Sequence, residues 1–227
     1  MTVLLVLFTF LLFILVDYLL HHRVPVRQPS SVETRTIPAK EFVAPASAYV
    51  DGFLVPENLR YHPGHSWATR ESKRRVRVGI DEFAAALLGK VERVELPKPG
   101  VWIRQGQKVL SFYRNGEKTT MVSPTEGEVI EVNQEILEDP GLLRKDPYGK
   151  GWVLLVDAPD EETVSRNLVP QNMVQTWMRA AVERLYALQP QLAGAVAADG
   201  GRPAEDLFQN LAATSWKTLT QEFFLTK

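Results

Sequence analysis

The sequence lacks cysteine, and this absence excludes several kinds of chemistry. None of its 227 residues offers a thiol that could form a disulfide, bind zinc, hold an iron–sulfur cluster or act as a nucleophile. The sequence also lacks an excess of one charge, because 26 basic residues stand against 27 acidic ones. This balance argues against a globally basic protein that binds nucleic acid, so we expect no nucleic-acid partner.

Charge is also absent from the start of the chain. No charged residue lies between Val3 and Val16, and residues 2–20 are apolar apart from Thr2, Thr9, Asp17 and Tyr18. An apolar helix of this length can just cross a bilayer core of ~30 Å, so we predict a transmembrane helix over residues 1–22. The alternative is the apolar part of a secretory signal. A signal, however, begins with Lys or Arg and ends in small residues, and this segment does neither.

The basic residues around this segment predict its orientation. Arg23 and Arg27 follow it, and no basic residue precedes it. Because positive charge is retained on the cytoplasmic side, we expect a single-pass protein of the plasma or inner membrane whose soluble part faces the cytoplasm.

The rest of the chain divides into three parts by composition. Residues 23–50 are rich in proline and serine and show no apolar periodicity, which predicts a flexible linker. Residues 51–160 carry short β-like runs separated by turn residues, and residues 161–227 carry helical patterns.

The fold class predicted for residues 51–160 is mainly β, a sandwich or barrel with short helices. A helix is expected at residues 81–89, where acidic residues begin the segment and glycine ends it. Asn115-Gly116 is typical of a type I′ hairpin turn. The runs that predict strands are residues 76–80, 91–96, 108–113, 118–122, 128–132 and 152–156.

Several motifs in this region resemble the glycine cleavage system H protein, in order and over about 100 residues. They are Tyr61-His62-Pro63-Gly64-His65-Ser66-Trp67, Val78-Gly79-Ile80-Asp81-Glu82-Phe83-Ala84, Leu88-Gly89-Lys90-Val91, Glu95-Leu96-Pro97-Lys98-Pro99-Gly100 with Gln105-Gly106, residues 123–133, and Asp146-Pro147-Tyr148-Gly149-Lys150-Gly151-Trp152. The resemblance implies a barrel-sandwich hybrid, in which two small β-sheets pack face to face as in lipoyl domains.

The resemblance also implies a carrier function that rests on one lysine. H proteins carry lipoate on a lysine at the tip of a hairpin, ten residues after the glycine matched by Gly106 and eight before the proline matched by Pro124. Both counts reach Gly116, so glycine replaces the modified lysine. Tyr113 matches the family's acidic residue three positions earlier. The nearest amine is Lys118, which we expect to be a solvated strand residue and which remains the alternative lipoyl site.

The C-terminal part predicts a helical hairpin. Apolar residues recur at helical spacing up to Leu188, Pro190 ends that helix, and a second helix is expected to begin near Pro203. Its apolar face either packs on the β domain or binds a partner. Three aromatic residues near the end of the chain make a protein or membrane contact worth testing: Trp216, Phe223 and Phe224.

The remaining candidate sites are weak. His62 and His65 could supply half of a metal site, but no third ligand is evident, so we expect no metal. The run Arg70–Arg77 contains five basic residues and is read as a solvated turn, with contact to anionic lipid head groups as the alternative. No phosphate loop, dinucleotide motif or Ser/His/Asp order is present, so we expect no enzyme activity.

Two functions follow from these observations. The first is a membrane-anchored H-protein-like scaffold or adaptor without a cofactor, which binds unidentified protein partners through the β domain and the C-terminal helices. The second is a lipoyl carrier that uses Lys118 to shuttle an aminomethyl or related group.

Overall fold

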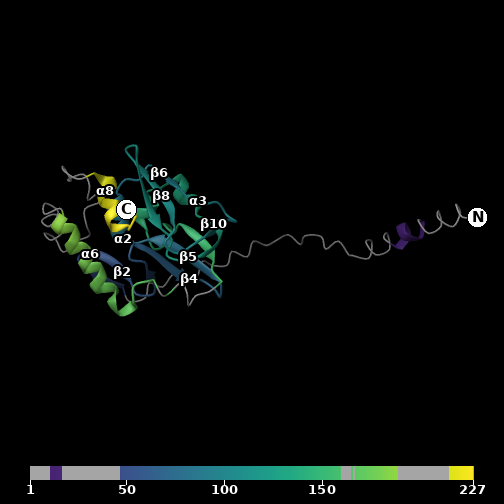
Figure 1. Ribbon diagram of the computed structural model, residues 1–227, viewed down its shortest axis with the longest axis horizontal. Helices are drawn as coiled ribbons and strands as arrows, with labels where there is room; N and C mark the ends of the chain where they lie inside the picture. The colour runs from purple at the N-terminus through teal and green to yellow at the C-terminus, as the bar shows by residue number, and fades with distance from the viewer. Residues whose placement is uncertain (1–10, 17–46, 160–164, 166, 189–214, 227) are drawn as a thin grey trace, which may run out of the picture. The chain divides into compact units, whose positions relative to one another are not determined.

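The computed structural model describes residues 11–16, 47–159, 165, 167–188 and 215–226 (Figure 1). The chain divides into two units, residues 1–42 and residues 43–227. In the first unit, residues 11–16 are helical. Within the described ranges no helix combines the length and the apolar composition that a membrane crossing requires. Most of the helix predicted over residues 1–22 lies outside those ranges.

The second unit is built mainly from β-strands, which confirms the predicted fold class. Six strands form one sheet in the order β3-β4-β5-β11-β10-β7, three form another in the order β6-β8-β9, and β1 pairs with β2. The strands are β1 Ser47–Val50, β2 Phe53–Pro56, β3 Arg60–Tyr61, β4 Ser66–Arg70, β5 Arg75–Ile80, β6 Arg93–Glu95, β7 Trp102–Ile103, β8 Lys108–Arg114, β9 Glu117–Val122, β10 Gly127–Val132 and β11 Leu154–Asp157.

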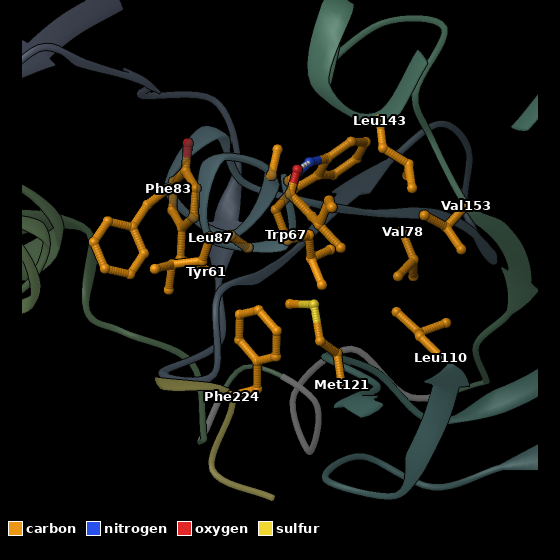
Figure 2. Close-up of a cluster of buried hydrophobic side chains, with 14 of the residues drawn as sticks. Tyr61, Trp67, Val78, Phe83, Leu87, Leu110, Met121, Leu143, Val153 and Phe224 are labelled. Carbon is orange, nitrogen blue, oxygen red and sulfur yellow. Dashed lines mark hydrogen bonds between the residues drawn. The ribbon is translucent and has the colours of Figure 1, made fainter. Parts of the chain in front are cut away.

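The two larger sheets enclose the core between them. Alternate residues of each strand point inward, so Val78 of β5 faces Leu110 of β8 and Met121 of β9 (Figure 2). All three side chains are completely buried. Removing apolar surface from water on this scale is the main force that holds the sheets together.

The opposite face of the six-stranded sheet is covered by Trp67 and the segment that follows β10. The Trp67 ring lies over Gly79, and its Nε1 donates to the carbonyls of Ile80 at 2.9 Å and Pro147 at 3.3 Å. That segment contains two short helices, α3 Gln134–Glu138 and α4 Leu142–Lys145.

The predicted helix at residues 81–89 is confirmed as α2, Glu82–Leu88. The Asp81 side chain caps it by accepting from Ala84 N at 2.7 Å, and Gly89 ends it with a φ of 61°. An oxygen at this position satisfies an amide that has no partner inside the helix.

The C-terminal part packs on the β domain and completes its core. It comprises the 3₁₀ turn η1 Gln171–Met173, helix α6 Val174–Leu188 and helix α8 Trp216–Phe223. Trp216, Phe223 and Phe224 are all buried, so these aromatic residues belong to the core and are not a free docking surface. The expected helix start near Pro203 lies outside the described residues.

The N-terminal edge of the β unit differs from the sequence prediction. The last four residues of the predicted linker form strand β1, Ser47–Val50. They pair with β2 across a turn in which Asp51 and Gly52 have φ values of 47° and 88°. This type I′ geometry suits the Asp-Gly dipeptide, a local signal that the composition of the linker obscures.

The turn between β3 and β4 depends on a neutral histidine. His62 N donates to Ser66 O at 2.8 Å, and the Nδ1 atom of His62 accepts from Gly64 N at 3.0 Å. Burial, and after it the neighbouring His65, lowers the pKa of His62 from 6.5 to about 4. Protonation of Nδ1 would remove the acceptor that closes the turn.

Substitution of Gly79 by alanine tests the packing of Trp67. A Cβ atom at this position would lie 2.3 Å from the indole ring, which is fully buried and cannot move away. We expect Gly79→Ala to lower the free energy of unfolding by about 2 kcal/mol, measured by urea denaturation. Gly116→Ala is the control, because a Cβ atom there would meet no atom within 4 Å. This variant should lose only the ~1 kcal/mol that a side chain costs at a positive φ. Equal losses in both variants would contradict the proposed packing.

Acid should destabilise the protein through His62. Because its pKa is lower in the folded state than in the unfolded state, the unfolded chain binds more protons between pH 6.5 and 4. Above pH 6.5, His62 therefore does not lower the free energy of unfolding. As the pH drops to 4, protonation of the unfolded chain at His62 lowers the free energy of unfolding by up to about 3 kcal/mol. His62→Asn keeps an acceptor near the Nδ1 position and does not titrate. Urea denaturation of the variant at several pH values should show a flatter pH dependence, and an unchanged slope would assign the acid sensitivity to other groups.

Candidate functional site

The hairpin of β8 and β9 has the geometry that its sequence predicts. Across the two strands, Tyr113 pairs with Lys118 and Arg114 pairs with Glu117. The two residues between them, Asn115 and Gly116, have φ values of 49° and 78°. A type I′ turn requires positive φ at both central positions, and its twist matches that of the strands it joins.

The tip of this hairpin carries no amine. Gly116 occupies the position that the H-protein resemblance assigns to the modified lysine, and a Cβ atom built there would meet nothing within 4 Å. The space that a long side chain would need is therefore open, but no side chain enters it. A positive φ also favours glycine at this position over any residue with a Cβ.

The nearest amine, Lys118, lies inside strand β9 and is bound to its neighbours. Its Nζ donates to Glu95 Oε2 at 3.3 Å and lies 5.3 Å from the centre of the Tyr113 ring. The Tyr113 hydroxyl, and after it Glu95, raises the pKa of the Lys118 ammonium group. The side chain is 47% exposed, so a solvated strand residue describes its setting.

Tyr113 organises this part of the sheet surface. Its hydroxyl donates to Glu95 Oε2 at 2.5 Å, and this bond is the main cause that lowers the pKa of Glu95. The Arg93 guanidinium carbon lies 3.6 Å from the centre of the same ring, in the geometry of a cation–π contact. Arg93, Tyr113 and Lys118 thus form one row across the three-stranded sheet.

Helix α8 supports the hairpin from the side. The Thr220 hydroxyl donates to Thr119 Oγ1 at 2.8 Å, and both side chains are buried. Ser215 Oγ donates to Glu117 Oε1 at 3.1 Å, next to the tip. A hairpin with this support has less freedom than one held at its base alone.

The sequence predicted some of the residues on this surface but not others. Lys118, Tyr113 and Gly116 were identified from the family spacing, and the structure brings them together on one hairpin. Glu95 and Arg93 were missed because they lie on another strand, although the register of alternating residues places them on the same sheet face. Ser215 and Thr220 were missed because their contacts join segments about 100 residues apart.

Both histidines have hydrogen-bond partners within the protein. His65 Nδ1 lies 2.8 Å from Asp81 Oδ2, and its ring stacks between Phe83 and Trp177 at centroid distances of 4.4 and 4.7 Å. His62 accepts a backbone hydrogen bond through its own Nδ1. Among the described residues, no group of three His, Asp or Glu side chains is arranged to hold a metal ion.

The basic run forms the turn between β4 and β5. Arg74 Nε donates to Asp157 Oδ1 at 2.8 Å, and Arg77 pairs with Glu71. These partners offset part of the local positive charge. The Arg74 side chain remains 60% exposed, as expected for a solvated turn.

Comparison with known proteins identifies relatives of the β unit. The model of the glycine cleavage H-protein family matches residues 59–180. The glycine cleavage system H protein of Bifidobacterium longum is 34% identical over 108 residues, which are 48% of this chain and 78% of the relative. The H protein of Xanthomonas campestris pv. campestris strain B100 is 32% identical over 121 residues, 53% of this chain and 92% of the relative.

A solved glycine cleavage system H protein from Mycobacterium marinum is 26% identical, with a TM-score of 0.47, and the match covers 54% of this chain and 98% of that one. The matched residues include both strands of the hairpin that holds Gly116, and they make up more than half of the sequence. This chain is therefore a member of the glycine cleavage H-protein family.

Proposed function

We propose that this chain is a membrane-anchored, H-protein-like adaptor that carries no lipoate and binds other proteins. The observation that carries this proposal is the hairpin tip, where Gly116 has a φ of 78° and offers no amine to a lipoylating enzyme. The hairpin keeps its turn geometry and its support from α8. It therefore provides a rigid surface for binding without the arm that group transfer requires.

A lipoyl carrier that uses Lys118 is the second candidate. Its support is the exposure of the side chain, 47%, and its position two residues beyond the family site. The same lysine pairs across the strands with Tyr113 and donates to Glu95, so it lies on the flat face of the sheet. An amine in a strand interior is a poorer substrate for an enzyme that recognises a hairpin tip.

The proposed location follows from the N-terminal segment. Residues 2–20 are apolar enough for a single-pass anchor, and the Arg residues behind them favour a cytoplasmic soluble domain at the plasma or inner membrane. The linker between the anchor and β1 would hold the β unit near the membrane, where a membrane-bound partner could meet it.

Peptide mapping of the chain purified from its native membranes tests the central claim. We expect the peptide that spans residues 108–124 to have its unmodified mass, because the tip holds glycine and Lys118 is bound within the sheet. The measurement is tandem mass spectrometry of the intact chain and of this peptide. A lipoyl mass on Lys118 would refute the adaptor proposal and establish the carrier.

A restored lysine provides the positive control for this experiment. Gly116→Lys places an amine in the open space at the tip, at a cost of ~1 kcal/mol for a side chain with positive φ. In a lipoylating host this variant should gain lipoate, and Lys118→Arg in the same background should leave the gain unchanged. If the restored lysine is not modified, the absence of lipoate in the natural chain does not depend on Gly116.

Fractionation tests the anchor. We expect the full chain to stay in the membrane pellet after alkaline washing, because an apolar helix of this length leaves the bilayer only at a large free-energy cost. A chain that begins after residue 22 should move to the supernatant. Recovery of the full chain in the supernatant would show that residues 1–22 do not anchor it.

A further inference from the structure

A small pocket lies between helices α6 and α8, which run close together in the second unit (Figure 1). Its volume is about 190 Å³. The lining is mostly apolar and comes from both helices, from the turn before β4 and from the residues after α8; it includes His65, Trp177, Ala180, Arg184, Phe223 and Leu225. The family match ends at residue 180, so α8 gives this chain a wall that the matched region does not supply.

Aromatic rings form one side of the pocket. The His65 ring is stacked between Phe83 and Trp177 and meets Phe223 edge to face at 6.3 Å. One of its nitrogens is engaged by Asp81 at 2.8 Å. This arrangement fixes the ring, so the wall is formed before any ligand arrives, and preformed walls reduce the entropic cost of binding.

Two tight turns of the backbone meet at the same place. Among the described residues, four that are not glycine have positive φ. Asp51 and Asn115 occupy hairpin turns that require this conformation. The other two, His65 with φ 64° and Leu225 with φ 55°, both line the pocket. His65 lies in the β3–β4 turn, and Leu225 follows the end of α8, where Thr226 N donates to Gln221 O at 3.1 Å. These hydrogen-bonded turns fix the backbone at the edge of the pocket.

The pocket also has polar groups and one exposed apolar residue at its edge. Arg184 of α6 forms an ion pair with Glu222 of α8, and its side chain is 56% exposed. Leu225 is 53% exposed, although most leucines in this unit are buried. A guanidinium group has five N–H donors, so Arg184 can keep its pair with Glu222 and also donate to the carbonyl of a peptide backbone.

We propose that this pocket binds one large apolar side chain, aromatic or branched, of a partner polypeptide, whose backbone carbonyl accepts from Arg184. The volume of about 190 Å³ is below the ~300–1,000 Å³ of pockets that hold whole small molecules, and it matches a single side chain. Buried anchors of this kind dominate the affinity of many protein interfaces. The choice of a polypeptide as the occupant rests on the adaptor role proposed above. The test of the pocket does not depend on whether the protein carries lipoate.

Fluorine NMR of the full chain in lipid nanodiscs tests this site with a defined probe. The five tryptophans are replaced by 5-fluorotryptophan, and Trp177→Phe assigns the pocket signal. N-acetyl-L-phenylalaninamide supplies an apolar side chain with a neutral backbone, and N-acetylglycinamide lacks the side chain. We expect the first probe to shift the Trp177 signal with millimolar affinity and the second to have no effect. Trp102, which is 52% exposed and does not line the pocket, should not respond.

A matched pair of variants locates the binding. Ala180 and Ala187 are both exposed positions on α6, but only Ala180 lines the pocket. Ala180→Leu should fill the opening and weaken the probe by at least about tenfold. Ala187→Leu adds the same group elsewhere and should leave the affinity within about twofold.

Each outcome decides the proposal. A shift of Trp177 that Ala180→Leu abolishes and Ala187→Leu preserves would establish the anchor site. No shift with N-acetyl-L-phenylalaninamide, or equal shifts with both probes, would overturn it. Much tighter binding of free L-phenylalanine than of the capped probe would also overturn it, since the occupant would then be a free amino acid. None of these results bears on the mass of the peptide spanning residues 108–124.

Discussion

The buried side chain of Asp81 joins the start of α2 to the turn before β4. One oxygen caps α2 through Ala84 N, and the other lies 2.8 Å from His65 Nδ1. Its backbone amide also donates to the carbonyl of His65. Because a buried polar group is costly unless it is hydrogen-bonded, each of these contacts stabilises the arrangement. They fix the His65 ring, on which Trp177 of α6 and Phe223 of α8 pack.

Short sequence patterns were enough to predict the elements whose conformation depends on neighbouring residues. The Asn115-Gly116 turn, α2 with its terminal Gly89 and the alternating strands all follow from neighbouring residues. Strands of two residues, such as β3 and β7, are too short to show a period, and only their partners define them. The spacing of the motifs identified Gly116, but the contacts of Lys118 with Glu95 depend on how β6 and β8 pair, which the sequence does not reveal by itself.

Helix α8 contributes both to the hydrophobic core of the β unit and to the support of its hairpin. Trp216, Leu219, Phe223 and Phe224 lie in the same hydrophobic cluster as the residues of the two sheets, so α8 is part of one core. Its N-terminal end also reaches the hairpin through Ser215, next to the Asn115-Gly116 turn. A glycine at the tip and support from α8 both agree with the fixed binding surface that we propose for this hairpin.

The position of α8 in the chain imposes an order on biosynthesis. The last sheet strand, β11, ends at Asp157, and α8 begins at Trp216. A ribosome that adds about 5–20 residues per second needs several seconds to make the residues between them. During that interval the sheets can pair, but the apolar surface that Phe223 and Phe224 cover stays exposed to other nascent chains or to chaperones. The final packing step must wait until the C-terminal segment has left the exit tunnel.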